Sequence, residues 1–270
     1  MPVARLNDVD INYLLEGDGP ETVVLINGLA DDLLTWFYQV ESLLKAGFRV
    51  LRFDNRGIGE SSKPAGPYTT ELFAQDAKAL VDHLGITNFH LMGVSMGGMI
   101  AQEYALAYES DLRSLTLACT YAAPGPFCSR MFSLWADIAA VQGVPMVMRD
   151  VTLWAFTQEF FETRGDELAE FETAMAYMNQ SVPAYLAQLH SIRQHDTTAR
   201  ISRLSVPTLV LAGEEDILIP VELSRKLHQL LPKSEFVTTP GGHGCMWEHP
   251  ESFNQHFIRF IKNSKGGDKQ

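Results

Sequence analysis

A chain of 270 residues is long enough for one large domain or two small ones, and its 46% hydrophobic and 20% charged residues predict a packed core rather than disorder. The net charge of −12, with no basic run, disfavours nucleic acid and anionic membranes as partners, because both attract clustered Lys and Arg. Three cysteines without paired spacing predict neither a disulfide framework nor a zinc site. Without a signal-peptide core or a membrane-length apolar stretch, we expect a cytoplasmic protein.

The first part of the chain alternates short apolar runs with amphipathic segments. Its strands are predicted at residues 3–6, 9–15, 22–26, 48–53, 89–92 and 112–118. Its helices are predicted at residues 36–45, 70–84 and, after Gly97, along a face with Ile100, Tyr104 and Ala107. Such alternation is typical of a parallel sheet with helices on both faces, in which ligands collect at the carboxyl ends of the strands.

Between residues 121 and 200 the alternation stops. This segment contains no convincing strand and reads as helices rich in aromatic and Met side chains, so we predict a helical cap inserted after the sixth strand. Alternation then resumes, with strands at 206–212 and 235–238 and helices at 221–231 and 251–261. The predicted division is a core of residues 1–120 and 201–270 and a cap of residues 121–200. The polar tail from Gly266 is expected to fray.

Gly93-Val94-Ser95-Met96-Gly97 lies between a predicted strand and a predicted helix, the context in which Gly-x-Ser-x-Gly forms a nucleophile elbow. The tight turn strains the backbone of Ser95 and exposes its hydroxyl. The two glycines allow strand and helix to approach closely, and the helix start directs free amides towards developing negative charge. The pentapeptide also occurs by chance in many chains, and its position between strand and helix favours the catalytic interpretation.

A serine hydroxyl needs a base, and imidazole titrates in the useful range. Of the eight histidines, His243 directly follows a predicted strand in the flexible loop 241–244, and it comes late in the chain, as the order nucleophile, acid, histidine requires. His249, next to Pro250, is the alternative, although its place at a helix start suggests a capping role. We therefore predict His243 as the base.

The base needs a carboxylate that orients it and stabilises its cation. The loop 213–220 follows the strand at 206–212, which places Asp216 at the required sheet edge, with Glu214 and Glu215 as alternatives. The strand at 112–118 ends in Cys119-Thr120 and offers no carboxylate for an alternative acid position.

The oxyanion of an acyl-transfer intermediate needs two backbone amides. The Met96 amide directly follows the predicted nucleophile, and the Leu29 amide lies in the loop after the third strand. The alternative interpretation of that loop is an ordinary strand–helix turn.

Five motifs in this order resemble the α/β-hydrolase superfamily over essentially the whole chain. They are Asn27-Gly28-Leu29, Asp54–Ser61, Gly93–Gly98, Gly213–Pro220 and Gly241–Gly244. The resemblance implies a mostly parallel eight-stranded sheet flanked by helices, and it is strongest to capped esterases, enol-lactonases and carbon–carbon-bond hydrolases. One motif departs from the usual His-Gly, because Asn27 precedes Gly28; we expect Asn27 to hold the loop by hydrogen bonds. The segment 54–62 is interpreted as a structural turn.

These residues predict a serine hydrolase that cleaves a small, largely apolar carboxylic ester or lactone through an acyl-enzyme, without a cofactor or metal. Serine in the elbow disfavours haloalkane dehalogenases and epoxide hydrolases, which use a carboxylate nucleophile. Perhydrolysis or cofactor-free haloperoxidase chemistry would use the same residues. The sequence indicates no oligomeric state.

Two alternatives remain at this stage. A carbon–carbon-bond hydrolase or enol-lactonase could bind a substrate carboxylate through an arginine of the cap, for which the candidates are Arg130, Arg149, Arg164 and Arg193. A ligand sensor on a hydrolase scaffold would keep the triad but turn over slowly.

Overall fold

The computed structural model describes residues 1–6, 8–176 and 179–264. The tail from Gly266, expected to fray, lies outside these residues. Eight strands form one sheet in the order β1-β2-β4-β3-β5-β6-β7-β8. The strands are β1 (Val3–Leu6), β2 (Val9–Glu16), β3 (Thr22–Ile26), β4 (Arg49–Phe53), β5 (Phe89–Val94), β6 (Leu112–Ala118), β7 (Thr208–Gly213) and β8 (Ser234–Thr239).

Only β2 runs against its neighbours, pairing antiparallel with β1 and β4, whereas all pairs from β4 to β8 are parallel. The mostly parallel eight-stranded sheet predicted from the sequence is therefore confirmed. β3, β5 and β7 are buried along their whole length, as expected for strands covered on both faces.

Eleven helices are present in the described part of the chain. They are α1 (Phe37–Lys45), α2 (Thr70–His83), α3 (Met96–Tyr108), α4 (Pro126–Gln142), α5 (Val144–Ala155), α6 (Gln158–Thr163), α7 (Gly165–Ala176), α8 (Val182–Gln194), α9 (Val221–Leu230), α10 (Cys245–Glu248) and α11 (Pro250–Asn263). Short 3-10 turns occupy Leu33–Trp36, Glu109–Asp111 and Ile201–Arg203. The helix predicted from residue 36 thus begins at Phe37, because Asp32 caps the preceding 3-10 turn by accepting a hydrogen bond from the Leu34 amide.

Each face of the sheet has its own apolar core. One core joins α2, α3 and α9 to the sheet, with Phe73, Ile100 and Leu227 among its buried members. The other joins α1 and α11, through residues such as Leu43 and Phe257. The two helical layers leave free the edge at which the parallel strands end.

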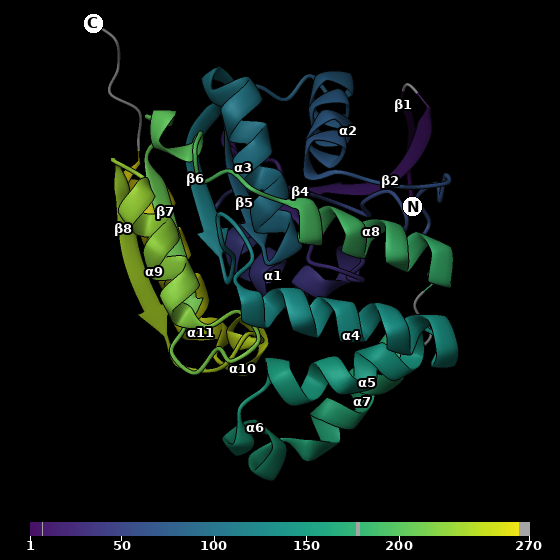
Figure 1. Cartoon of the computed structure of the whole chain (residues 1–270). Helices are drawn as coiled ribbons and strands as arrows, with labels where there is room; N and C mark the ends of the chain where they lie inside the picture. Colours follow the sequence, from purple (N-terminus) through teal and green to yellow (C-terminus); the bar gives the residue numbers. More distant parts are fainter. Residues whose placement is uncertain (7, 177–178, 265–270) are drawn as a thin grey trace, which may run out of the picture.

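In the sequence, the five helices α4 to α8 follow β6 and precede β7, and the described residues of this segment include no strand. We call them the inserted helices. In Figure 1, α4 to α7 gather beyond the arrowheads of β6 and β8, which places them over the carboxyl ends of the strands. Any site at that edge of the sheet therefore lies beneath these helices.

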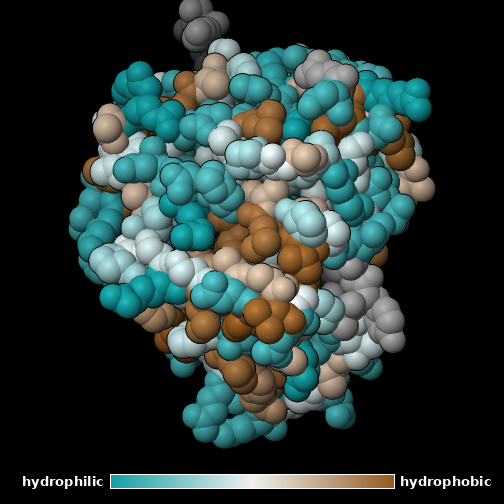
Figure 2. Space-filling view, turned by 45° about the vertical axis from the view of Figure 1, so that its right-hand side comes forward, coloured by the Kyte–Doolittle hydropathy of each residue, from teal (hydrophilic) through white to brown (hydrophobic). Residues whose placement is uncertain are grey.

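The inserted helices also carry much of the exposed apolar surface. Apolar side chains interrupt the polar surface in the middle and lower part of Figure 2. On α4 the exposed residues Phe127, Leu134 and Val141 are spaced seven apart, and on α5 Met146 and Leu153 share that spacing. Within the described ranges, no helix is both long and apolar enough to span a bilayer.

Candidate active site

Ser95 occupies the sharp turn between β5 and α3. Its backbone angles are φ 54° and ψ −119°, a left-handed φ that non-glycine residues rarely adopt. The surrounding glycines are required by space, since a Cβ on Gly93 would lie 2.0 Å from the Gly97 carbonyl oxygen, and one on Gly97 would lie 2.0 Å from the Ile26 carbonyl oxygen. Strand and helix therefore meet in a turn too tight for a side chain at either glycine position.

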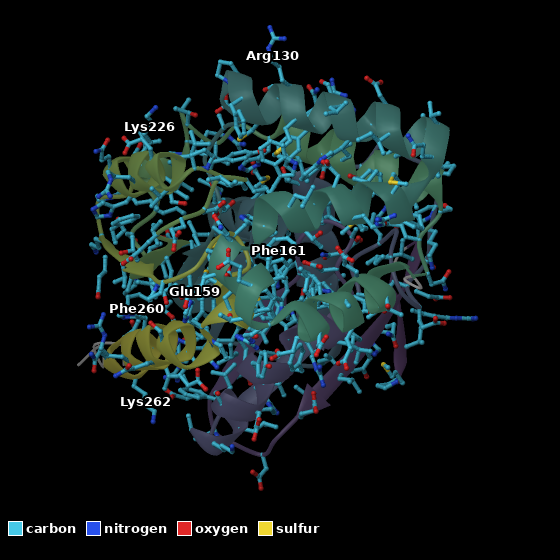
Figure 3. All side chains as sticks on the ribbon, turned by 90° about the horizontal axis from the view of Figure 1, so that it is seen from below. Arg130, Glu159, Phe161, Lys226, Phe260 and Lys262 are labelled. Atoms are coloured by element: carbon cyan, nitrogen blue, oxygen red, sulfur yellow. The ribbon has the colours of Figure 1, made fainter. Side chains whose placement is uncertain are left out.

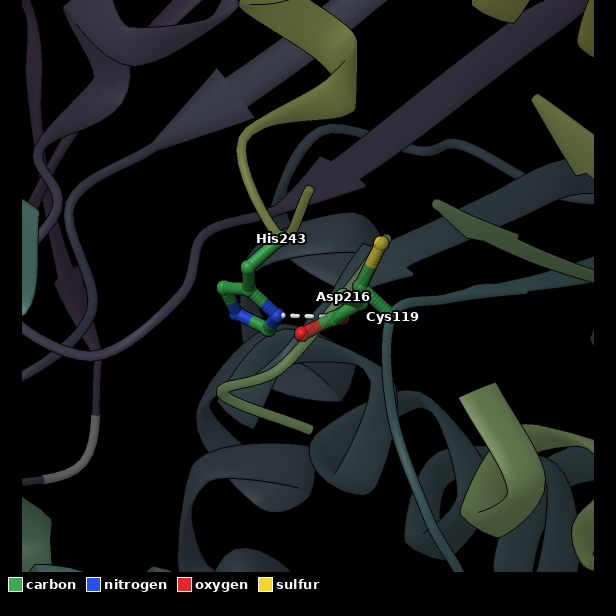
Figure 4. A group of neighbouring side chains, drawn as sticks. All are labelled: Cys119, Asp216 and His243. Carbon is green, nitrogen blue, oxygen red and sulfur yellow. Dashed lines mark hydrogen bonds and ion pairs between the residues drawn. The ribbon is translucent and has the colours of Figure 1, made fainter. Parts of the chain in front are cut away.

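His243 and Asp216 come from the loops after β8 and β7. His243 Nδ1 lies 2.8 Å from Asp216 Oδ2, and the second carboxylate oxygen accepts a hydrogen bond from the Ile219 amide at 2.8 Å. Figure 4 shows the imidazole edge against the carboxylate. The Asp216 side chain is fully buried, whereas the His243 side chain keeps 11% exposure. With Nδ1 engaged, Nε2 is the ring nitrogen left for a substrate or nucleophile.

The environment of His243 stabilises the imidazolium. Burial alone lowers the pKa of His243, but the charge and hydrogen bond of Asp216 outweigh burial, and Cys119 and Asp31 add smaller contributions of the same sign. The net effect raises the pKa above the ordinary 6.5 of histidine. A histidine placed in this way readily accepts a proton from a neighbouring hydroxyl.

Ser95 and His243 line the same pocket, between the sheet edge and the inserted helices. The Ser95 hydroxyl makes no hydrogen bond to another described residue. The pocket wall contributed by the inserted helices is largely apolar and consists of Phe132, Trp135, Met148, Val151, Thr152, Ala155, Phe156, Phe171 and Ile192. The predicted nucleophile and base thus share one cavity with a largely apolar wall.

Of the two predicted oxyanion amides, one belongs to a residue that lines the pocket and the other to the residue after Ser95. Leu29 lines it directly, and Met96 is the first residue of α3, where backbone amides lack intrahelical acceptors. Neither amide donates a hydrogen bond to any residue that the structure describes. Ala30, next to Leu29, has φ 59°, and its amide donates to the Gln188 side chain of α8 at 3.3 Å. The loop is therefore anchored on its far side while Leu29 remains available.

Asn27 holds this loop through its side chain. Its amide nitrogen donates to the carbonyl oxygens of Asp31 at 3.1 Å and Phe53 at 3.0 Å, and its oxygen accepts from Trp36 Nε1 at 2.5 Å. Asn27 is fully buried, so each of these bonds replaces one that water would otherwise make. The expected loop-holding role of Asn27 agrees with these contacts.

The alternative residues lie elsewhere. Glu214 and Glu215 are exposed. His249 does not line the pocket, and although it is the N-cap residue of α11, its side chain makes no capping hydrogen bond. Its place at a helix start therefore agrees with the sequence interpretation, whereas the expected capping bond is missing.

None of the four candidate arginines lines the pocket. Arg130, Arg149 and Arg193 are exposed, and Figure 3 shows Arg130 pointing away from the molecule. Arg164 is paired with Glu167 and donates to the Glu248 carbonyl oxygen at 3.0 Å. A substrate carboxylate would have no arginine partner in this cavity.

The segment 54–62 is structural. Asp54 accepts hydrogen bonds from the amides of Leu33 at 2.8 Å and Glu60 at 2.9 Å, which fix the turn. Arg56 and Asp76 form a buried ion pair at 2.5 Å beneath it. These contacts agree with the structural role expected from the sequence.

Three residues close to the candidate site were not predicted. Asp31 lines the pocket, and Glu248 links the histidine loop to the inserted helices: its Oε1 accepts from the Gly242 amide at 2.7 Å and its Oε2 from the Thr157 hydroxyl at 2.5 Å. The sulfur of Cys119 lies near the acid and base, with potential ligand atoms of Cys119, Asp216 and His243 all within 4.8 Å of one another. These residues are 27 to 124 positions apart, so sequence spacing gave no sign that they form a possible metal-ligand group.

The fold and this pocket together define an α/β hydrolase. The model of the α/β-hydrolase fold matches residues 21–250, and the chain belongs to this family.

Three relatives illustrate its position in the family. A Caulobacter segnis protein provisionally named carbamate hydrolase RutD is 27% identical over 91% of this chain and 93% of its own length. The 3-oxoadipate enol-lactonase 2 of Acinetobacter baylyi is 28% identical over 92% of this chain and 91% of its own length. Among solved structures, the enol-lactonase of Burkholderia xenovorans superposes with a TM-score of 0.90 and 28% identity, covering 97% of this chain and 100% of that one. The expected membership of the α/β-hydrolase superfamily is thus confirmed.

Proposed function

We propose that this protein is a serine hydrolase of small carboxylic esters or lactones, with Ser95, His243 and Asp216 as the catalytic triad. The observation that carries the proposal is a strained serine and an Asp-paired histidine lining one apolar pocket. The relatives named as an enol-lactonase and a carbamate hydrolase support hydrolysis at a carbonyl carbon. We further propose that residues 121–200 act as the cap and residues 1–120 and 201–270 as the core.

Acylation follows from the placement of these groups. Ser95 Oγ attacks the carbonyl carbon while His243 Nε2 takes the hydroxyl proton, and Asp216 stabilises the resulting imidazolium. The backbone amides of Leu29 and Met96 donate to the oxyanion, a contribution of about 3 kcal/mol for each such donor. His243 then protonates the leaving oxygen, which departs as an alcohol or, from a lactone, remains attached to the acyl group.

Deacylation repeats these steps with water. His243 removes a proton from water, the hydroxide oxygen bonds to the acyl carbon, and the Ser95 oxygen leaves with the proton held by His243. This sequence needs no cofactor. The apolar wall of the pocket favours an uncharged, largely apolar acyl group, because burying an unpaired charge there is unfavourable.

Ser95→Ala tests the nucleophile. We expect kcat/KM for p-nitrophenyl hexanoate to fall by about 10³-fold or more, since triad members act as a unit. Ser133→Ala on α4 is the matched control, because its hydroxyl bonds only the Ser129 carbonyl oxygen at 2.9 Å. Full activity of Ser95→Ala would overturn the assignment.

Two further measurements complete the test. A fluorophosphonate probe followed by peptide mass spectrometry is expected to label Ser95, and label on another residue would contradict the mechanism. Steady turnover supports an enzyme, whereas a burst that stops at one product per protein would support a ligand sensor.

A further inference from the structure

Asp31 places a carboxyl group in the proposed active site. It follows the oxyanion loop, is 8% exposed and lines the same pocket as Ser95 and His243. An ideal Cβ built on Gly28 would lie 2.6 Å from Asp31 Oδ2 and 3.6 Å from Ser95 Cβ, so both side chains are close neighbours of the Gly28 backbone. The carboxyl therefore lies beside the position where a substrate carbonyl must bind to react with Ser95.

The charge of this carboxyl is compensated only in part, by His243 across the pocket. Among the described residues that line the pocket, there is no lysine or arginine, and His243 is already paired with Asp216. The residues around Asp31 are otherwise mostly apolar, so water screens its charge poorly. The Gly28 backbone amide is a neighbour of this carboxyl, but no described side chain is its hydrogen-bond partner, so the described contacts reveal no structural purpose for an acid at this position.

The titration of Asp31 agrees with this geometry. Burial, and then the negative charge of Asp32, raise its pKa to about 7, while His243 and the Gly28 amide oppose the increase. Asp32 on the same loop and His243 across the pocket are the titratable groups that act on it. Above neutral pH the pocket therefore holds a carboxylate, and below neutral pH it holds a neutral carboxyl that can donate a hydrogen bond.

We propose that Asp31 is a specificity-determining residue that disfavours substrates carrying a negative charge and favours substrates carrying an ammonium group or another hydrogen-bond donor. This inference rests on the proposed hydrolase function and narrows its substrate class. Coulomb repulsion between two anions in a poorly screened cavity weakens binding of the wrong substrate, and attraction strengthens binding of the right one. Anionic enol-lactones are accordingly poor candidates for the natural substrate.

The test compares p-nitrophenyl esters of equal chain length and different charge. The substrates are the hexanoate, the adipate monoester and the 6-aminohexanoate, and rates at pH 8.5 are corrected for spontaneous hydrolysis. We expect the wild-type protein to prefer the 6-aminohexanoate over the adipate by at least tenfold in kcat/KM. Asp31→Asn, which keeps the side-chain shape, should reduce that ratio at least fivefold, and a ratio unchanged within twofold would overturn the proposal.

Asp32→Asn is the matched control. It removes the same charge from the neighbouring position, but Asp32 does not line the pocket and Asn also serves as an N-cap. Its charge preference should stay within twofold of wild type. If Asp31→Asn does not fold, the wild-type protein alone still decides: the preference should weaken at pH 6, where Asp31 is protonated, and a preference equal at pH 6 and 8.5 would contradict the proposal.

A binding measurement separates this inference from the proposed function. Trp135 and Trp247 line the pocket, so their fluorescence can report titrations with hexylamine, hexanol and hexanoate. If no ester is hydrolysed in a Ser95-dependent manner, the hydrolase proposal fails, while tighter binding of hexylamine than hexanoate, lost in Asp31→Asn, still supports the role of Asp31. Ester hydrolysis without charge preference would leave the hydrolase proposal intact and contradict the proposed role of Asp31.

Discussion

Asn27 is the residue on which the geometry of the oxyanion loop depends most directly. Its three side-chain hydrogen bonds join this loop to β4 and to the 3-10 turn before α1. Because all the partners are buried, removing the amide leaves several polar groups without water or protein contacts.

Asn27→Ala is therefore expected to lower the free energy of unfolding by about 2–4 kcal/mol, since each orphaned buried group costs about 1–3 kcal/mol. It should also reduce kcat more than it raises KM, because a loosened Leu29 amide stabilises the oxyanion less. Urea unfolding and steady-state kinetics measure both effects. Asn27→Asp, which keeps only the bond from Trp36, should lie between wild type and alanine; equal kcat for all three would contradict the anchoring role.

At the residue level, the residues proposed as catalytic were easier to single out from the sequence than their surroundings. Ser95 and His243 were predictable because glycines mark their loops and because these loops follow the parallel strands β5 and β8, so the sheet brings them to one edge. Asp31 was not predictable, since an Asp-Asp pair in a strand–helix loop is an ordinary sequence feature that does not indicate a buried side chain. The site assignments themselves stay predictions until the variants are measured.

At the level of elements, the ends of β6 and β7 lie side by side, and this gives two positions from which an acid could reach His243. Asp216 follows β7, while Cys119 follows β6 and has a sulfur within 4.8 Å of the Asp216 and His243 ligand atoms. Cys119 has φ 47°, a conformation that Asp tolerates better than most residues.

Moving the acid between these strand ends is a direct test of that adjacency. Asp216→Asn should lower kcat by about 10⁴-fold, the effect of neutralising a triad acid elsewhere. Adding Cys119→Asp should raise kcat of this variant at least tenfold, whereas adding Cys119→Asn, its neutral counterpart, should leave kcat unchanged. Esterase kinetics on the three variants provide the measurement, and equal rates for both double variants would show that the end of β6 cannot supply the acid.

The elements of the sheet were predictable to within a few residues, because buried parallel strands are short continuous apolar runs. The buried face of α3 was predicted less accurately. Ile100 and Tyr104 are buried as predicted, but Ala107 is exposed, because α3 is buried on all sides up to Ala105 and emerges only in its last turn. The packing of the inserted helices was not predictable, since their aromatic residues are distributed around several faces without one clear stripe.

At the level of the whole molecule, two buried histidines link folding to pH. Burial lowers the pKa of His90 to about 4 and that of His195 to about 3. Each ring has one nitrogen without a described partner, Nε2 in both cases. The unfolded chain binds protons at these side chains near pH 6.5, whereas the folded protein does not, so both histidines reduce stability as the pH falls from about 6.5 towards 4.

His90→Asn should remove part of this pH dependence. A pKa difference of this size means that each histidine lowers the free energy of unfolding by about 2 kcal/mol at pH 5 relative to pH 7. Asn can keep the hydrogen bond to Ser114, which His90 Nδ1 makes at 2.8 Å. Urea unfolding at pH 7 and pH 5 should show that the free energy of unfolding falls less for His90→Asn than for wild type. His83→Asn, on the exposed face of α2, should match wild type. Identical losses in all three proteins would refute the linkage.

The hydrogen bonds around Glu248 join the loop of His243 to the junction of α5 and α6. Glu248 accepts from the Gly242 amide and the Thr157 hydroxyl. In the same loop, the Gly244 amide donates to the Ala155 carbonyl oxygen at 2.7 Å, directly where α5 ends. The junction of α5 and α6 is thereby fastened on both sides of His243. Because the two segments are joined on both sides of His243, any displacement of this junction would also shift the loop that carries the proposed base, so the reactivity of Ser95 should depend on how the inserted helices are seated.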